Sequence, residues 1–168
     1  MELTTVIVLV VLGVALLYAI MLYNQLVSVK HAVSQAWSNI DVLLRQRHDE
    51  LPKLVEACRR YMQHESQTLE RVIAARSAVA SARADEDVKG VGRAESVLRA
   101  GLGQLFALAE NYPELKANES FQHLHERISG LENGIADRRE LYNAAVNINN
   151  VRIDQFPEVL LARLFGFK

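Results

Sequence analysis

Residues 3–22 constrain the fold most, because they form a long apolar run without a single charged side chain. The run reads LTTVIVLVVLGVALLYAIML. As an α-helix it would be about 30 Å long, which matches the hydrocarbon thickness of a bilayer. Tyr18 and Tyr23 lie near its end, where aromatic side chains suit the membrane interface. We therefore predict a transmembrane anchor over residues 1–23, with the lipid bilayer as a partner.

A cleaved signal peptide is the alternative for this run, and the sequence argues against it. Only two residues precede the run and neither is basic, the apolar stretch is too long, and no clear small-residue cleavage site follows. Lys30, Arg45 and Arg47 all follow the run. The positive-inside rule therefore predicts a single-pass protein of the inner membrane, with its N-terminus outside and its C-terminal domain in the cytoplasm.

The single cysteine excludes an intrachain disulfide framework.

The remaining sequence has the apolar periodicity of helices rather than of strands. Apolar residues recur at spacings of three and four, and good helix formers such as Ala, Leu, Glu and Arg are abundant. Three stripes follow this spacing, namely Trp37, Ile40, Leu44, Leu51, Leu54, Cys58 and Tyr61; Val91, Ala94, Leu98, Leu102, Leu105 and Leu108; and Phe121, Leu124, Ile128, Leu131, Ile135 and Tyr142. We predict an all-α fold in which an N-terminal transmembrane helix is followed by an antiparallel helical bundle over residues 24–155.

Glycine and proline mark the expected helix ends. The stretch ADEDVKGVG (84–92) predicts a loop, YPELKAN (112–118) predicts another that ends in the N-cap Asn118, and Pro157 ends the last long helix. Pro52 leaves two alternatives. Either Asp49 caps a new helix there, or one long helix is kinked at Pro52. The split gives four helices of more similar length, so we favour a four-helix bundle over a kinked three-helix one.

The tail FPEVLLARLFGFK (156–168) is a short apolar segment with few charges. Four antiparallel helices, the first of which leaves the membrane, return the end of the fourth helix to it. The tail then either lies in the headgroup interface as an amphipathic segment or packs against the base of the bundle. The residues expected to face the interface are Phe156, Leu160, Leu161, Leu164, Phe165 and Phe167.

No motif in the sequence predicts catalysis, a metal site or a cofactor. His48 and Asp49 are adjacent, so their side chains point about 100° apart on a helix. His123 and His125 are two residues apart, whereas helical zinc motifs use spacings of three or four. The chain has no phosphate-binding glycine loop and no nucleophile elbow, and a net charge of −1 does not indicate nucleic-acid binding. We therefore expect no enzyme and no catalytic, metal or cofactor-binding residues.

Some polar residues fall where the helical pattern predicts an apolar side chain, or gather late in the last long helix. Buried charges are costly unless they are paired, so we expect Arg47 or Arg138 to meet Glu65 or another acid between helices, and the asparagines to form hydrogen bonds between helices or to contact a partner. A ligand or partner site within the bundle is the alternative. The candidates are Arg47, Glu65, Arg76, Arg138, Asn143 and Asn149.

Several segments in this order and spacing resemble the LemA family of bacterial membrane proteins. They are YNQLV (23–27), AWSNIDVLLRQRHDELPKLVE (36–56), HESQTLERVIAAR (64–76), LFALAENYPELKANESFQHL (105–124), RRELYNAAV (138–146) and FPEVLLARLFGF (156–167). The resemblance implies one N-terminal transmembrane helix, a short external N-terminus and a helical cytoplasmic domain. It implies no enzymatic activity. At 149–150 the chain has Asn-Asn, where the family more often has Tyr-Asn.

These observations favour a membrane-anchored, non-enzymatic bundle that acts by self-assembly or by scaffolding other membrane proteins. Anchoring in one plane raises the effective concentration of the copies, so weak lateral contacts suffice. We expect a homo-oligomer. The alternative is a sensor or signalling adaptor that binds a ligand among the inward polar residues.

Overall fold

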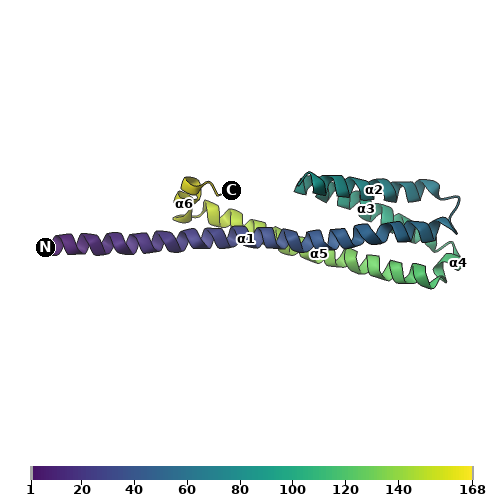
Figure 1. The fold of residues 1–168 in the computed structure, drawn as a ribbon, viewed down its shortest axis with the longest axis horizontal. Helices are drawn as coiled ribbons and strands as arrows, with labels where there is room; N and C mark the ends of the chain where they lie inside the picture. Colours follow the sequence, from purple (N-terminus) through teal and green to yellow (C-terminus); the bar gives the residue numbers. More distant parts are fainter. Residues whose placement is uncertain (1, 168) are drawn as a thin grey trace. The chain divides into compact units, whose positions relative to one another are not determined.

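The computed structural model describes residues 2–167 and is all-helical over that range, which confirms the predicted fold class. Figure 1 shows the helices as a ribbon. They are α1 (Leu3–Arg59), α2 (Ser66–Ala84), α3 (Val88–Ala109), α4 (Pro113–Lys116), α5 (Glu119–Asp154) and α6 (Glu158–Phe165). The chain forms two compact units. Unit 1 comprises the residues up to Ile40 and those from Asp137 onwards, and unit 2 comprises Asp41–Ala136.

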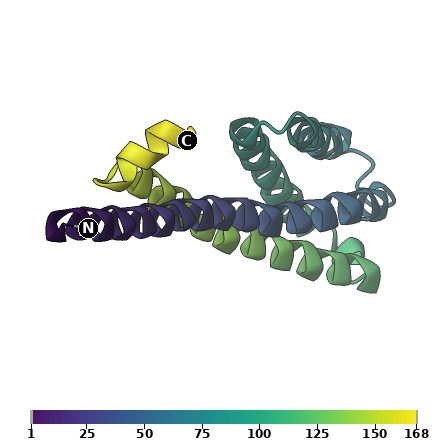
Figure 2. The same cartoon turned by 60° about the vertical axis from the view of Figure 1, so that its left-hand side comes forward.

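Unit 2 holds a hydrophobic core formed by the second part of α1, α2, α3, α4 and the first part of α5. The helical stripes seen in the sequence provide it, because every third or fourth residue lies on one face. Leu54, Cys58, Met62, Val72 and Leu105 are all fully buried there. Figures 1 and 2 show α2 and α3 joined by a short connection. Burial of large apolar side chains stabilises the unit by about 1.5–3 kcal/mol for each of them.

Pro52 does not divide the first helix, so the favoured split at this residue was wrong. α1 continues through Pro52 to Arg59, and the chain turns only over residues 60–65. Pro52 lacks the N–H that would bond to the carbonyl oxygen of His48 four residues earlier. In the structure that oxygen accepts a hydrogen bond from Nε of Arg76 at 3.0 Å. The donor from α2 therefore replaces the missing backbone donor, and the helix can continue.

The connection between α2 and α3 is shorter than the predicted loop 84–92. α3 begins at Val88, so both glycines of that stretch lie inside its first turns. Val91 is buried, and this contact outweighs the weak helix propensity of its glycine neighbours. The other predicted boundary is confirmed at Asn118, whose Oδ1 accepts a hydrogen bond from the backbone N–H of Phe121 at 3.0 Å. This bond caps the N-terminus of α5.

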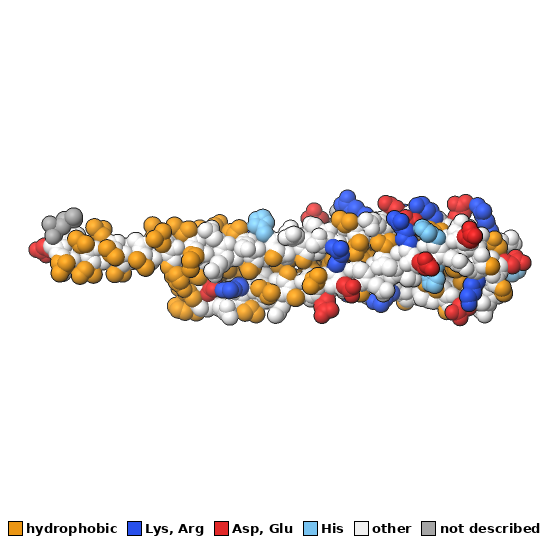
Figure 3. Space-filling view, turned by 90° about the horizontal axis from the view of Figure 1, so that it is seen from below, with side chains coloured by type: hydrophobic (Ala, Val, Ile, Leu, Met, Phe, Trp, Pro, Cys, Tyr) orange, Lys and Arg blue, Asp and Glu red, His pale blue; other side chains and the backbone are white. Residues whose placement is uncertain are grey.

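Unit 1 contains the apolar N-terminal part of α1. Of the described residues, this helix alone is long and apolar enough to cross a membrane, by length and composition. Its large apolar side chains from Val6 to Met21 are exposed, whereas Leu22 and Leu26 are buried. Figure 3 shows hydrophobic side chains covering this part of α1 on the face in view. The exposed run ends where the rest of unit 1 begins to cover the helix.

The second part of α5 lies antiparallel to α1 in unit 1. The Trp37 ring contacts the Tyr142 ring, with centroids 5.6 Å apart, and Tyr23 contacts Phe165 at 4.9 Å. Asp154 ends α5 just before Phe156-Pro157, as the proline predicts. The chain then reverses into α6, which Figure 2 shows.

Candidate functional site

The first group of polar residues lies in unit 2, where α1 and α2 run side by side. Arg76 donates from Nε to the His48 carbonyl oxygen, and its Nη2 lies 2.7 Å from His48 Nε2. Burial, followed by the neighbouring Arg76 guanidinium, lowers the pKa of His48 below its usual value. A neutral imidazole can accept a hydrogen bond at Nε2, which suits the arginine donor. The Arg76 side chain therefore bonds to both the backbone carbonyl and the imidazole of His48, and this carbonyl is the one that Pro52 leaves without a backbone donor.

A second group surrounds Arg47, which is only 1% exposed although it interrupts the apolar stripe of α1. Its guanidinium forms ion pairs with Glu95 of α3 and Glu132 of α5. Glu132 also lies 3.8 Å from Nε of Arg99. The Arg47 cluster, formed by Arg47, Glu95 and Glu132, therefore joins three helices of unit 2. Its geometry supports the expected role of an interhelical ion pair that fixes how the helices meet.

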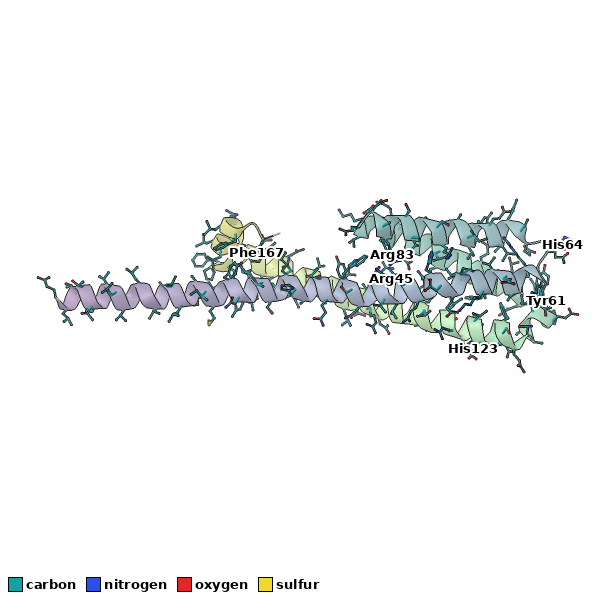
Figure 4. All side chains as sticks on the ribbon, viewed as in Figure 1. Arg45, Tyr61, His64, Arg83, His123 and Phe167 are labelled. Carbon is teal, nitrogen blue, oxygen red and sulfur yellow. The ribbon has the colours of Figure 1, made fainter. Side chains whose placement is uncertain are left out.

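Further ion pairs lie at the edges of unit 2. Arg83 of α2 donates to Asp41 of α1 at 2.7 Å, and Arg45 contacts the other oxygen of the same carboxylate at 2.9 Å (Figure 4). The hydrogen bond from Arg83 is the main reason why the pKa of Asp41 is lowered. Glu50 pairs with Arg127 of α5 at 3.1 Å. Asp41, Arg47 and Glu50 of this stretch therefore bind residues of other helices, and none of these contacts forms a nucleophile–base pair.

The histidines and the cysteine lie in different parts of the fold. Within residues 2–167, no three His, Cys, Asp or Glu side chains lie close enough to hold a metal ion. His64 lies in the α1–α2 connection and His123 near the start of α5, both exposed (Figure 4). His125 packs against the Phe106 ring at 4.2 Å. Cys58 is fully buried, and burial raises the pKa of its thiol to about 12, so it is a poor nucleophile in the folded protein.

The third group lies in unit 1, where α6 meets α1. The ring of Tyr23 is 4.9 Å from that of Phe165 and 5.7 Å from that of Phe167, both edge-on. Nζ of Lys30 lies 5.7 Å from the centroid of the Phe167 ring. Phe167 is labelled beside α1 in Figure 4. The tail residues are thus held at the end of the apolar run of α1.

The tail has one buried side and one exposed side. Glu158 and Ala162 are buried, and Glu158 accepts a hydrogen bond from Arg152 of α5 at 2.9 Å. Three of the residues expected from the sequence to face the membrane interface, Phe156, Leu160 and Leu164, are exposed, and Phe165 remains partly exposed although its ring contacts Tyr23. Leu161 and Phe167 are half-buried. One side of the tail therefore packs against the rest of unit 1, and the other side leaves an apolar surface exposed.

The candidate polar residues on α1 and α2 lie in the contacts between helices. Arg47 and Arg76 have the partners described above, and Glu65, just before α2, accepts a long hydrogen bond of 3.4 Å from the Tyr112 hydroxyl. The acids that meet Arg47 are Glu95 and Glu132, so of the alternatives that the sequence left open it is other acids, and not Glu65, that pair with this arginine. The helical pattern contained a signal for Glu95, because it lies four residues after Val91 and three before Leu98 on the buried stripe of α3.

Two of the candidates on α5 differ from the expectation. Arg138 is exposed, so its predicted inward position was wrong. Ile128 and Ile135 are buried on α5, and Arg138 is rotated from Ile135 by about 60° around the helix. Asn143 is also exposed and therefore outside the contacts between helices, whereas Asn149 is buried.

Comparison with known proteins gives one family and a small group of relatives. The model of the LemA family matches residues 36–168. Magnetosome proteins MamQ 2 and MamQ 1 of Paramagnetospirillum magneticum are each 39% identical to the chain over 67 residues. Magnetosome protein MamQ of Magnetospirillum gryphiswaldense is 36% identical over 67 residues. Each match covers 40% of this chain and 25% of the relative, so the chain spans about a quarter of the length of these curated relatives.

Neither the family description nor the relatives' names state an enzymatic activity. The relatives are named for a magnetosome, and the short match gives no reason to carry that role to this chain. The family match is different, because it extends over most of the chain and includes the Arg47 cluster, Arg76 and the tail. The chain therefore belongs to the LemA family.

Proposed function

We propose that this chain is a non-enzymatic membrane protein, anchored by the N-terminal part of α1, that acts by assembling with further copies of itself. The anchor is supported by the exposed large apolar side chains from Val6 to Met21, which need a nonpolar surrounding. We further propose the inner membrane as its location and the cytoplasm as the location of the domain, on the strength of the basic residues that follow the run.

The observation that carries the assembly proposal is an exposed apolar stripe on α5 in unit 1. Leu141, Ala144, Ile148 and Val151 are exposed and follow one another at spacings of three, four and three. This is the spacing by which one helix packs along another. We call these four residues the α5 stripe. Large apolar residues in a continuous exposed line are typical of surfaces that are covered by a partner.

The charge of the surrounding segment favours a second copy of the chain as that partner. Residues 141–151 read LYNAAVNINNV and contain no charged side chain. Two identical surfaces that approach each other repel when they carry the same net charge, and this one carries none. Asn143 and Asn147, exposed beside the α5 stripe, can exchange hydrogen bonds at the edge of such a contact. Anchoring in one membrane adds effective concentration.

Energy transfer between differently labelled copies of the full chain in lipid vesicles tests this proposal. We expect transfer above the level of random encounters, and a return to that level in the double variant Leu141→Asp, Ile148→Asp. Val97 of α3 provides the matched control, since it is 62% exposed where Leu141 is 65% exposed, and Val97→Asp should leave the transfer unchanged. Transfer at the random level in the native chain contradicts the proposal, as does an equal loss in the control.

A further inference from the structure

The helix α6 presents two sides of different character. Glu158 and Ala162, four residues apart, are the buried side. Leu160 and Leu164 lie about 140–180° around the helix from the middle of that side, and both are strongly exposed, as is Phe156, which precedes α6. The acidic group on the buried side is paired with Arg152. The exposed side therefore consists of large apolar residues, and the carboxylate of α6 points away from it.

The end of α6 is folded back onto α1. Gly166 has φ 68°, the left-handed conformation that favours glycine, and it ends the helix. This turn brings Phe167 against Tyr23 and under the ammonium group of Lys30. Together with the contact between Tyr23 and Phe165, it fixes α6 at one height along α1.

That height is the end of the apolar run of α1. Tyr23 directly follows Leu22, the last residue of the run, and the large apolar residues before Leu22 are exposed. A membrane that contains the run has its interface at Tyr23, because aromatic residues at the end of a span lie at headgroup level. The exposed apolar side of α6 is then at the same level, and a bilayer that surrounds the run also covers it.

From this juxtaposition we infer that α6 is an interfacial membrane helix, with Phe156, Leu160 and Leu164 inserted into the boundary between headgroups and acyl chains of the bilayer that α1 crosses. This inference rests on the anchoring part of the proposed function. Arg163 is exposed between the buried and the apolar sides, where its guanidinium can reach the phosphates. The protein thereby binds the membrane surface at a second point, which limits tilting of the chain at the interface.

Spin labels on the full chain in nanodiscs with a single copy per disc test this inference. The discs contain phosphatidylcholine and phosphatidylglycerol. Nitroxides are placed through Leu164→Cys and, separately, Leu160→Cys, and their collisions with oxygen and with a water-soluble nickel chelate are compared. Cys58 is buried and unreactive, and the unsubstituted chain gives the labelling blank.

Two exposed valines of α1 and one residue of α6 provide the references. Val14 lies within the apolar run, and Val42 lies about 28 Å beyond Tyr23 along the helix. We expect labels at Leu164 and Leu160 to favour oxygen over nickel, as at Val14, and the label at Val42 to favour nickel. A label introduced by Arg163→Cys should collide with nickel more often than the one at Leu164.

The outcomes separate this inference from the anchoring on which it rests. If Val14 is protected from nickel while Leu164 and Leu160 are as accessible as Val42, α6 is not in the interface, although the anchor stands. If Val14 is itself accessible to nickel, the anchoring proposal fails and the inference with it. If Leu164 is protected only in discs that hold several copies, a second chain covers α6 and the inference is overturned.

Discussion

We predict that Pro52 and Arg76 are energetically coupled through His48, although they do not bond to each other. Arg76 donates a hydrogen bond to the His48 carbonyl oxygen, which Pro52 cannot do because it has no N–H. Replacing Arg76 by Met should therefore lower the free energy of opening of unit 2 by more in the native chain than in a Pro52→Ala chain. In the alanine chain the new backbone N–H can bond to the same oxygen.

The magnitude follows from the bonds that are lost. In the native chain Arg76→Met removes the donors to the carbonyl and to the imidazole, and an unsatisfied acceptor costs about 1–3 kcal/mol. The methionine keeps the alkyl stem that lines a pocket of about 220 Å³ with Leu51 and Val72. In the Pro52→Ala chain only the imidazole contact is lost, which costs about 0.5–1.5 kcal/mol. The loss of the imidazole contact is common to both chains, so the coupling free energy equals the cost of the unsatisfied carbonyl, about 1–3 kcal/mol. Pro52→Ala alone stabilises the helix by up to about 3 kcal/mol.

Labelling of the buried Cys58 thiol measures these free energies in unit 2 of the full chain. The thiol reacts only when the core opens, so the labelling rate relative to that of the unfolded chain gives the free energy of opening. Arg71→Met is the matched control on the same helix, since Arg71 is exposed and has only a long contact of 3.5 Å with Gln104. An equal cost of Arg76→Met in both chains refutes the reasoning, because the carbonyl would then not depend on Arg76.

Three further predictions concern the stability of unit 2. Arg47→Met should raise the labelling rate of Cys58 by an amount equivalent to about 3–5 kcal/mol, because it removes the arginine that pairs with the buried Glu95 and with the partly buried Glu132; a loss below about 1 kcal/mol would show that the cluster is solvated. Gly103→Ala meets open space and should lower that rate by the equivalent of about 1 kcal/mol, whereas Gly134→Ala should lower it less, since its Cβ would lie 3.2 Å from Leu43. The lowered pKa of His48 means that the unfolded chain binds its proton more tightly, so the urea midpoint should fall as the pH drops below 6.5, and the fall should be smaller after His48→Gln. An equal fall in both chains would assign the pH dependence to other groups.

The parts of the fold that follow from local pattern could be predicted, and those that depend on helix order could not. The apolar run and the stripes through Leu54, Leu102 and Ile128 specify helices and their buried faces, since burial of one face at helical spacing is a local property. The partner of Arg47 is not local. Glu95 and Glu132 lie on different helices, and only the order of helices around the core decides which acid reaches the guanidinium.

The helix end that the sequence predicted at Pro52 shows why one local signal was misleading. Proline in the interior of a helix costs stability because a carbonyl loses its donor, and within α1 nothing can replace that donor. A residue of another helix can replace that donor, but which residue does so depends on where the chain turns and how the two helices pack, and the local sequence does not specify this. The basic residues Arg59 and Arg60 at the end of α1 are a second signal, since they suit the carbonyl end of a helix.

The same contacts fix where the chain turns. The pair His48–Arg76 and the pair Asp41–Arg83 are both centred on residue 62, so α1 and α2 are antiparallel about Met62, which is fully buried. A turn at Pro52 would have paired His48 with a residue near 56 and would have left Arg76 far from it along the chain. The turn at 60–65 keeps the number of long helices at four, and this preserves the return of α5 and α6 to Tyr23 that the four-helix prediction required. Pro52 is therefore tolerated inside α1 because the chain turns at residues 60–65. This position of the turn sets the register that brings Arg76 to the carbonyl that Pro52 leaves without a donor.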